Sequence, residues 1–494
     1  MKVKTLDQRH PSLDQGRLGR LWALYEGGER WERLLDTWFP KLAAESDEVW
    51  IERKANARYV NHAGSVVSML AAALFAEAPQ IEGLEGDYWG RLWLDCDGQG
   101  SAWARWWQAR LEDAQVGRHA FIWVNLPARP ADILVDNRAD EERQKLLDAY
   151  LVPLTAEQVI DWGEDARGQL TWILAKDSTS ERNGPDEIRR TTTRWTYIDA
   201  TRIRRWTWTA TEQKPTPDPD DEVTEASPIE HRIGRLPVVR LQLPPGLWTM
   251  GKVEGPAVLA LRARNDLSWA LHQAANELLV LTTKWEDNKP VLGHGRYLTL
   301  QRDKDGEDTA AYVGPSGVAF EHLAADVGAT REEVYRAVQQ MALSSDASSA
   351  KARLSGESKA EDWRALDIVL AAYQDLVLQA MRQVLGVILA ARGEGAEPSV
   401  SGLDGWQSED LAGWLEACSL ATDAAEMSFK FRQLVAKRQA QRVLQDEVDA
   451  KDLEEVYQEI DEAEPPPAPF VPPPSIGQRP GAPGGPQDDS AAQG

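Results

Sequence analysis

Three long segments with helical spacing of apolar residues, all in the second half of the chain, constrain the fold more than any other feature. They cover residues 256–281, 319–343 and 362–392. The first begins at Pro256, a residue suited to the first turn of a helix. About 25 residues at a rise of about 1.5 Å make a rod about 38 Å long. We therefore expect a fold built around helix–helix contacts in this half.

The two stretches between these helices differ in character. Residues 282–318 contain prolines, glycines and two strand-like runs around the turn DKDGED, and they predict a β-hairpin. Residues 344–357 contain mainly serine, alanine and a few charges, and they predict a polar loop. Within the second helix, Thr330 and Glu333 form a capping-box pattern, and Gly328 just before them predicts a kink.

The first half of the chain predicts helices followed by strands. Helical spacing occurs in residues 13–40, as two short helices, and again in 58–79 and 101–117. After Gly117 the period changes to that of strands, in six short segments rich in β-branched and aromatic residues that extend to residue 210. The predicted fold class is therefore α+β, mainly helical.

Further along, residues 212–230 are acidic and proline-rich and predict an exposed loop, and a strand-like segment, 236–243, follows them. Another strand is predicted within residues 399–406. Residues 408–463 are predicted to be helical, and the composition of 464–494 is that of a disordered tail.

The charges of the helical C-terminal region are separated along the chain. Residues 428–442 carry five basic side chains and no acid, whereas residues 444–464 carry ten acids and one lysine. Two explanations stay open: a solvated surface with oppositely charged ends, or pairing between subunits that lie side by side. The candidates for such pairing are Lys430, Arg432, Lys437, Arg438, Glu454 and Glu455.

The composition limits the classes of partner. With 55 basic and 79 acidic side chains, the net charge is −24, which is the wrong balance for a protein that binds nucleic acid by neutralising many phosphates. The only cysteines, Cys96 and Cys418, allow no disulfide framework and fit a reducing compartment. We expect no signal peptide, because the first residues lack an apolar core, and no membrane span, because the apolar runs are too short.

The sequence contains no pattern that demands catalysis. Neither a P-loop nor a dinucleotide-binding glycine motif occurs, the seven histidines are scattered, and no metal or cofactor is expected. Isolated His62 is interpreted as structural. Ser348 and Lys351 have the SxxK spacing of some serine hydrolases, but neither SDN nor KTG accompanies them, so coincidence in a serine-rich loop is the competing explanation. We expect that the protein is not an enzyme.

The order of segments in the second half resembles that of the portal proteins of tailed bacteriophages, the head-to-tail connectors. The words LYEGGERW, RYVNHAGSVVSMLAAALF, VIDWGEDARGQLTWIL, GRLPVVRLQLPPGLW and ARLSGESKAEDWRAL are also similar to segments of that family. The resemblance covers most of residues 14–463. It implies an N-terminal wing (1–250), a first stem helix (251–281), a clip (282–318), a second stem helix (319–343), a tunnel loop (344–357), a wing helix and strand (358–407), and a helical crown (408–463).

The resemblance also implies a function. The subunits of that family form a dodecameric ring at one capsid vertex, through which double-stranded DNA is packaged and later ejected. The implied partners are further copies of the chain, the large terminase subunit, the major capsid protein and a head-completion or adaptor protein. The implied location is the virion, with assembly in the host cytoplasm. An ATP-driven motor in a separate terminase agrees with the missing P-loop.

The resemblance assigns two further sets of residues. The tunnel loop would face DNA in the channel, and its small polar side chains suit transient phosphate contacts that do not arrest a moving duplex. The clip charges would face terminase. Two alternatives stay open, namely another phage head structural protein, such as a head-completion or scaffolding protein, and the serine hydrolase. The tunnel-loop residues are Ser344, Ser345, Asp346, Ser348, Ser349, Lys351, Arg353 and Ser355, and the clip residues are Arg302, Asp303, Lys304, Asp305, Glu307 and Asp308.

Overall fold

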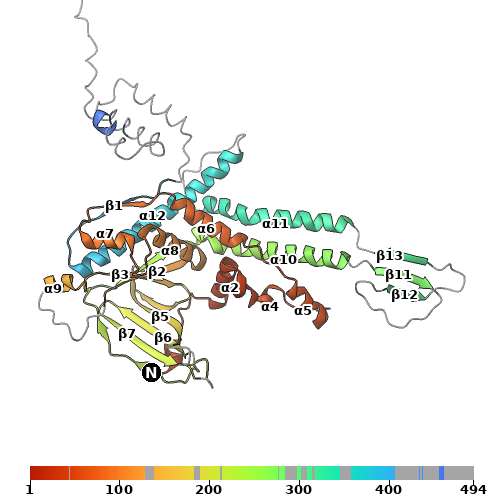
Figure 1. Cartoon of the computed structure of the whole chain (residues 1–494), viewed down its shortest axis with the longest axis horizontal. Coiled ribbons are helices and arrows are strands. Elements are labelled where there is room, and N and C mark those ends of the chain that lie inside the picture. The colour runs from red at the N-terminus through yellow and green to blue at the C-terminus, as the bar shows by residue number, and fades with distance from the viewer. Residues whose placement is uncertain are drawn as a thin grey trace, which may run out of the picture. The chain divides into compact units, whose positions relative to one another are not determined.

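The chain divides into two units, Met1–Gln407 and Ser408–Gly494, which are described separately (Figure 1). The fold mixes helices and strands, so the predicted α+β class is confirmed. The computed structural model describes residues 1–43, 45–127, 138–182, 190–211, 214–275, 278–283, 297–301, 309–313, 317–344, 358–405, 433, 437 and 456–460.

The N-terminal part of the first unit is helical. Three short helices, rather than the two predicted, occupy residues 13–40, because Arg33 and Leu34 interrupt the second one. A fifth helix was not predicted, since none of its side chains is buried and it therefore lacks an apolar stripe. The helices are α1 (Val3–Leu6), α2 (Gln15–Glu26), α3 (Gly28–Glu32), α4 (Leu35–Trp38), α5 (Asp47–Ala55), α6 (His62–Leu74), α7 (Asp87–Leu94), α8 (Trp103–Gly117) and α9 (Arg138–Arg143).

All six strand segments predicted between residues 119 and 210 are strands, and they are divided between two antiparallel sheets. One sheet has the order β10-β2-β3. The other has the order β4-β5-β6-β7-β8, with β9 also paired to β7. The strands are β2 (His119–Asn125), β3 (Tyr150–Thr155), β4 (Val159–Glu164), β5 (Leu170–Glu181), β6 (Arg190–Asp199), β7 (Arg202–Thr209), β8 (Thr224–Glu225), β9 (Ile229–Glu230) and β10 (Val238–Gln242).

The acidic segment that was predicted to be a loop is partly ordered by pairing. It is exposed, as expected, but two short strands within it, β8 and β9, pair with β7. The chain start also lies against it, because Val3 N donates to Asp221 O at 3.0 Å and the Nζ of Lys4 donates to Asp220 at 2.9 Å. Backbone pairing therefore supplies order that the acidic, proline-rich composition does not suggest.

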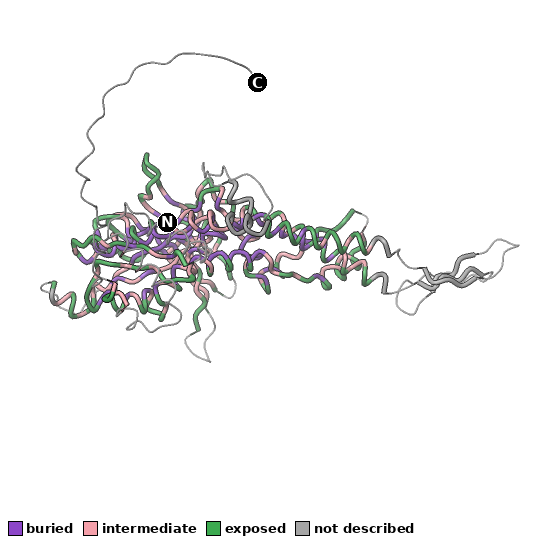
Figure 2. Tube along the Cα trace, turned by 90° about the horizontal axis from the view of Figure 1, so that it is seen from above, coloured by how far each residue is buried: buried purple, intermediate pink, exposed green. Residues whose placement is uncertain are grey.

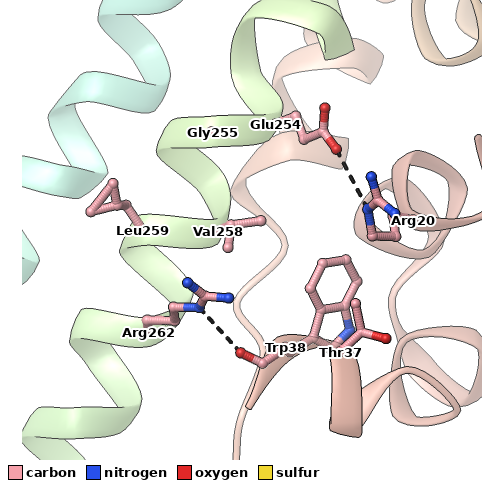
Figure 3. A pocket seen from close by; sticks show the side chains of 8 residues that line it. All are labelled: Arg20, Thr37, Trp38, Glu254, Gly255, Val258, Leu259 and Arg262. Carbon is pink, nitrogen blue, oxygen red and sulfur yellow. Dashed lines mark hydrogen bonds and ion pairs between the residues drawn. The ribbon is translucent and has the colours of Figure 1, made fainter. Parts of the chain in front are cut away.

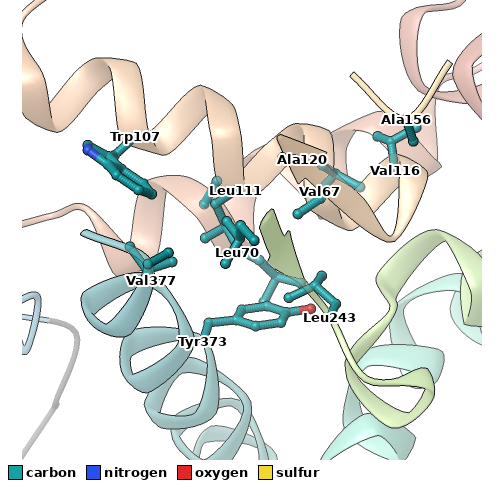
Figure 4. Packing of buried hydrophobic residues seen from close by; sticks show 14 of the residues in the cluster. Val67, Leu70, Trp107, Leu111, Val116, Ala120, Ala156, Leu243, Tyr373 and Val377 are labelled. Atoms are coloured by element: carbon teal, nitrogen blue, oxygen red, sulfur yellow. The ribbon is translucent and has the colours of Figure 1, made fainter. Parts of the chain in front are cut away.

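A large apolar core joins the helices of this unit. Its centre lies between α6, α8 and the long helix α12 (Ser358–Arg392), where Trp107, Leu111, Leu70 and Tyr373 are completely buried (Figure 4). Burying an aromatic ring of this size stabilises the fold by several kcal/mol, about 3 for a side chain the size of Phe. Strand β14 (Ser399–Gly402) follows α12 and pairs with β1 (Pro79–Glu82), in agreement with the strand predicted near residue 400.

Two helices lie side by side and extend from this core. They are α10 (Thr249–Ala275), which follows the short 3-10 helix η1 (Pro245–Leu247), and α11 (Gly317–Ser344); together they are called the arm, and the remainder of the first unit is called the body. Figure 2 shows that buried residues gather in the body, whereas the described part of the arm is largely exposed or intermediate.

The first helix of the arm differs from its prediction at both ends. It begins at Thr249, so Pro256 lies inside it and not in its first turn. A proline there removes one helical hydrogen bond, which the flanking contacts of α10 must offset. The helix ends at Ala275, and the apolar run that was predicted to extend it to Leu281 is instead strand β11 (Leu278–Thr283). Apolar spacing alone does not separate a helix end from a short strand.

The predicted hairpin between the two arm helices is wrong in its pairing. The two predicted strands exist as β12 (Tyr297–Gln301) and β13 (Thr309–Val313), but they do not pair with each other. Both pair with β11, which is the central strand, parallel to β12 and antiparallel to β13. Because residues 278–281 were predicted to be helical, the prediction lacked the central strand. Its two neighbours were therefore predicted to pair with each other.

The predicted capping box in α11 is also wrong, because a single helix passes through Gly328 and Thr330. The hydroxyl of Thr330 donates to the carbonyl oxygens of Asp326 (2.9 Å) and Val327 (3.2 Å), within its own helix. A threonine inside a helix commonly bonds back to the preceding turn in this way. The same residue types can therefore form a cap or lie in mid-helix.

In the second unit, the described residues lie close together. Residues 456–460 are helical, and the Nε2 of Gln433 donates to the carbonyl oxygen of Ile460 at 2.8 Å. The ammonium of Lys437 lies 5.8 Å from the ring centroid of Tyr457. Across the part of the chain that the structure describes, no helix has the length and apolar content needed to cross a membrane.

Candidate functional site

The buried side of α11 is a narrow line of side chains. Every third or fourth residue is buried or intermediate, whereas the residues between them are exposed. This spacing places the line on one side of the helix, as in the seam of a two-helix coiled coil. The line consists of Phe320, Leu323, Val327, Thr330, Val334 and Ala337.

Helix α10 has contacts on more than one side. It lies between α11 and the N-terminal helices (Figure 1), and it also contacts α6 and α8. Its first half includes buried residues at most turns, among them Val253, Ala257 and Leu261. The body therefore holds α10 in place, and α11 packs beside it with further contacts to α6, α12 and η1.

Polar contacts fix α10 to the N-terminal helices at defined points. The side chain of Asn265 accepts from the backbone N–H of Arg58 at 2.8 Å and donates to its carbonyl oxygen at 3.0 Å. One turn earlier, Arg262 Nε donates to the carbonyl oxygen of Trp38 at 3.1 Å. Since Asn265 is 6% exposed, its amide would be costly to leave unpaired, and these bonds set the position of α10 along its axis.

A buried polar group fixes the beginning of α10. The hydroxyl of Thr249 donates to Gln115 on α8 at 2.9 Å and lies 2.7 Å from the hydroxyl of Tyr373 on α12. That phenol donates to the carbonyl oxygen of Leu247 at 2.7 Å, and burial raises its pKa, so it stays protonated. Helices α8, α10 and α12 are therefore joined by hydrogen bonds at one point in the core.

A groove of about 430 Å³ lies between α10 and the N-terminal helices (Figure 3). Leu259 is 54% exposed, which is unusual for a leucine in a helix with this many buried positions. Glu254 is the groove's acidic side chain, and it receives both Arg17 Nε at 2.8 Å and Arg20 Nε at 3.8 Å. The groove is lined by Arg20, Thr37, Trp38, Glu254, Gly255, Val258, Leu259 and Arg262.

The groove has a cationic rim around an apolar floor. Arg20 and Arg262 stand at its edges, and Figure 3 shows them on opposite sides of Val258 and Trp38. One carboxylate, Glu254, points toward Arg20 and pairs with it and with Arg17. The local positive charge contrasts with the net charge of −24 of the whole chain. Such a surface suits a partner that presents acidic side chains beside small or apolar ones.

Most residues that were predicted to form the functional sites lie outside the described residues. Ser344 is the last residue of α11, and the rest of the tunnel-loop set lies in 345–357, which are not described. The clip charges, Arg302 to Asp308, and five of the crown residues, Lys430, Arg432, Arg438, Glu454 and Glu455, are likewise outside. Lys437 is described, and its ammonium lies near the ring of Tyr457 in its own unit. The proposed roles of all these residues stay predictions.

Neither a candidate metal site nor a reactive thiol occurs among the described residues. No group of three or more His, Cys, Asp or Glu side chains among them could hold a metal ion. Cys96 is buried, and burial raises the pKa of its thiol to about 12, so it is a poor nucleophile. His62 lies at the start of α6 with Nδ1 at 3.5 Å from the hydroxyl of Tyr335 on α11, and desolvation lowers its pKa. This contact agrees with a structural role.

The groove was not predicted from the sequence, because residues that are far apart along the chain form it. Thr37 and Trp38 come from α4, whereas Leu259 and Arg262 come from α10, more than 200 residues later. One signal was present: Leu259 and Arg262 are three positions apart and therefore lie on the same side of a helix, where an arginine is unexpected if that side faces the core. That pattern indicates a partly exposed helix face but not the element opposite it.

Comparison with known proteins gives structural likenesses only. No protein-family model and no curated protein matches the chain. It is similar to a chain in the virion of a native gene transfer agent (GTA) particle, with 14% sequence identity and a TM-score of 0.42, over 84% of this chain and 98% of that one. It is also similar to a chain in the neck of an empty GTA particle, with 14% identity and a TM-score of 0.42, over 80% and 94%. At this TM-score neither likeness carries an argument about this chain.

Proposed function

We propose that this chain is a structural protein of a phage-type particle and, more specifically, a portal subunit. In this proposal, copies of the chain form a dodecameric ring at one vertex of the capsid. Double-stranded DNA passes through the ring during packaging and ejection. The observation that carries the proposal is the order of elements: α10, a small three-stranded sheet, α11, the polar segment 345–357 and the long α12. This is the order that the sequence resemblance to portal proteins leads one to expect.

The electrostatics support a channel wall better than a nucleic-acid clamp. A duplex that must move cannot be held by many lysine–phosphate pairs, because each pair adds to the affinity. The chain has a net charge of −24. The charged side chains of segment 345–357 are Asp346, Lys351, Arg353 and Glu357. In this proposal the loop contacts passing phosphates briefly, the small sheet with segment 302–308 faces a separate terminase motor, and the chain is not an enzyme.

The remaining partners follow from the same proposal. The body would face the major capsid protein and a head-completion protein, and the finished ring would be part of the virion. The alternative role, that of a scaffolding or head-completion protein, has less support, because it gives no reason for two paired helices that join a small sheet to a large body. The hydrolase alternative depends on Ser348 and Lys351, which lie outside the described residues.

Assembly of the purified full-length chain tests the proposal. Native mass spectrometry should find a closed species of twelve or thirteen copies of the 55.0 kDa chain, and negative-stain images should show rings with a central opening. A duplex should bind such rings weakly and lose its affinity with a shallow dependence on salt. Monomers or two-fold dimers under all conditions, or a steep salt dependence, would contradict it.

A further inference from the structure

We propose that Arg264, Arg331 and His62 form a binding site for a phosphate-class oxyanion where the arm joins the body. These three side chains, called the cationic cluster, come from α10, from α11 and from the first residue of α6. The inference does not depend on the proposed ring, because all three side chains belong to one chain. Free phosphate and a phosphodiester of a nucleic acid share this chemistry, and the experiment below separates them.

The three helices of the cationic cluster meet beside the body. Helix α6 contacts both helices of the arm (Figure 1). The Nδ1 of His62 lies 3.5 Å from the hydroxyl of Tyr335 on α11, and the two ring centroids are 6.1 Å apart. Arg331 is four positions before Tyr335 and therefore lies on the same side of α11. This contact places His62 beside the side of α11 that carries Arg331.

The charges of both arginines act on His62. Desolvation lowers the pKa of the imidazole, and the positive charges of Arg331 and Arg264 lower it further. No carboxylate of a described residue acts on this pKa in the opposite direction. Two guanidinium groups and an imidazole therefore converge without a counter-charge, and a bound anion would relieve their repulsion.

The two guanidinium groups of the cationic cluster are unpaired. Neither Arg264 nor Arg331 has a hydrogen bond or an ion pair with another described residue. A nearby arginine on the same helix differs, because Arg336 lies 3.9 Å from Glu332. The chain has 79 acidic and 55 basic side chains, so a shortage of carboxylates does not explain the unpaired cations.

On α10, the nearest acid along the chain faces another direction. Asp266 is two positions from Arg264, which turns it by about 160° around the helix axis. Burial raises the pKa of Asp266, and the cations that oppose this effect are Arg53 and Arg262, not Arg264. Asp266 therefore belongs to the side of α10 that faces the N-terminal helices.

On α11, the acids near Arg331 also lie on other sides of the helix. Glu333 is two positions from it and Asp326 is five, so they are turned by about 160° and about 140° around the axis. Glu332 is turned by about 100° and pairs with Arg336. An external anion would therefore supply the counter-charge that the cationic cluster lacks.

The donors suit an oxyanion with several charged oxygens. Each guanidinium offers parallel N–H groups that match two oxygens of a phosphate. With Tyr335 beside Nδ1, the Nε2 of His62 has no partner among the described residues and can donate a third hydrogen bond. His62 is also the first residue of α6, so the positive end of that helix dipole adds to the field.

Equilibrium dialysis of the full-length chain with radiolabelled inorganic sulfate tests the site in any state of assembly. We expect saturable binding of one sulfate per chain with a Kd of about 1 mM. Arg264→Gln and Arg331→Gln should each weaken binding about tenfold, since each removes a charged donor. Both arginines are exposed, so the variants should fold, which circular dichroism checks. Arg336→Gln is the matched control and should change the Kd less than about twofold.

The pH dependence gives an independent readout. Sulfate remains a dianion over the range in which histidine titrates, and a bound anion raises the pKa of His62, so binding should tighten as the pH falls. His62→Gln should remove most of this dependence. An equal dependence in His62→Gln and the wild type would show that the imidazole does not contact the anion.

Competition separates the two sources of the anion. Unlabelled inorganic phosphate should displace the sulfate. Displacement by a short DNA duplex as well would identify a phosphodiester as a ligand, whereas displacement by phosphate alone would identify a free anion. Absence of saturable binding, or wild-type affinity in the Arg264→Gln and Arg331→Gln double variant, would overturn the site. Rings without sulfate binding would leave the proposed function standing, and binding without rings would leave only the site.

Discussion

The two helices of the arm run side by side but are held in different ways. Helix α10 has buried residues at most turns of its first half, hydrogen bonds to Arg58 and Trp38, and a buried hydroxyl network at its beginning. Between Phe320 and Ala337, helix α11 buries one line of side chains and exposes the others. The difference indicates that the body holds α10 more firmly than α11, although α11 also contacts α6, α12 and η1.

The largest expected effect comes from apolar truncation in the two helices. Leu261→Ala on α10, where the leucine is 4% exposed, should lower the free energy of unfolding by about 3 kcal/mol. Leu323→Ala on α11, where the leucine is only half-buried, should lower it by about 1 kcal/mol. Urea unfolding of the monomeric chain followed by circular dichroism measures both. Equal losses of unfolding free energy in the two variants would contradict the conclusion that the body holds α10 more firmly than α11.

The body that holds α10 should also respond to pH through Asp113 on α8. Burial raises the pKa of this carboxyl from its usual value near 3.8 to about 6, although Arg110 lies 2.8 Å away. The folded state therefore binds the proton more tightly than the unfolded state. The contribution favours folding below about pH 4 and is lost as the pH rises through about 6.

Asp113→Asn should remove that contribution. The difference in unfolding free energy between the variant and the wild type should therefore change by up to about 3 kcal/mol between pH 4 and pH 6. The measurement is the difference in unfolding free energy between the variant and the wild type at several pH values. Glu82→Gln, at an exposed carboxylate at the end of β1, is the matched control for the loss of one acidic group. A slope that is the same in Asp113→Asn and the wild type would contradict the assignment.

A smaller effect is expected where α10 is joined to the N-terminal helices by Asn265. Asn265→Leu removes both hydrogen bonds to Arg58 and leaves a backbone N–H and C=O without their partner, at a cost of about 2 kcal/mol. Asn56→Ala removes an exposed side-chain bond on α5 and should cost less than about 0.5 kcal/mol. Hydrogen exchange should show faster exchange at Arg58 in the first variant alone.

The smallest effect is expected inside α11. Thr330→Val keeps the shape of the side chain and removes only a hydroxyl that bonds within its own helix, so the stability should change by less than about 0.5 kcal/mol. A helix cap at this position would cost about 1 kcal/mol to remove. Asp14→Ala is the control, because Asp14 caps α2 by accepting from Arg17 N at 2.9 Å. Similar losses in both variants would mean that Thr330 acts as a cap.

Sequence reasoning succeeded where one period dominated and failed where two elements shared one pattern. The strands after Gly117 and the helix that contains Trp107 were predicted because their spacing is unbroken. The apolar run at 278–281 continues the helical pattern of α10, and only pairing with β12 and β13 makes it a strand. Local sequence cannot represent pairing with residues that are 18 to 35 positions away along the chain.

The groove could not be predicted for a related reason. Each of its walls is unremarkable alone: a short helix ending at Trp38, and a long helix that carries Leu259 and Arg262. Its shape follows from tertiary contacts such as that of Arg262 with the carbonyl oxygen of Trp38. Exposure of Leu259 is likewise a property of the packed structure and not of the residue type.

A three-dimensional reconstruction of the assembled full-length chain by electron cryo-microscopy tests the central claim most directly. We expect a closed ring in which segment 345–357 faces the central axis. Segment 345–357 on the outer surface, or the absence of a closed ring, would contradict the account.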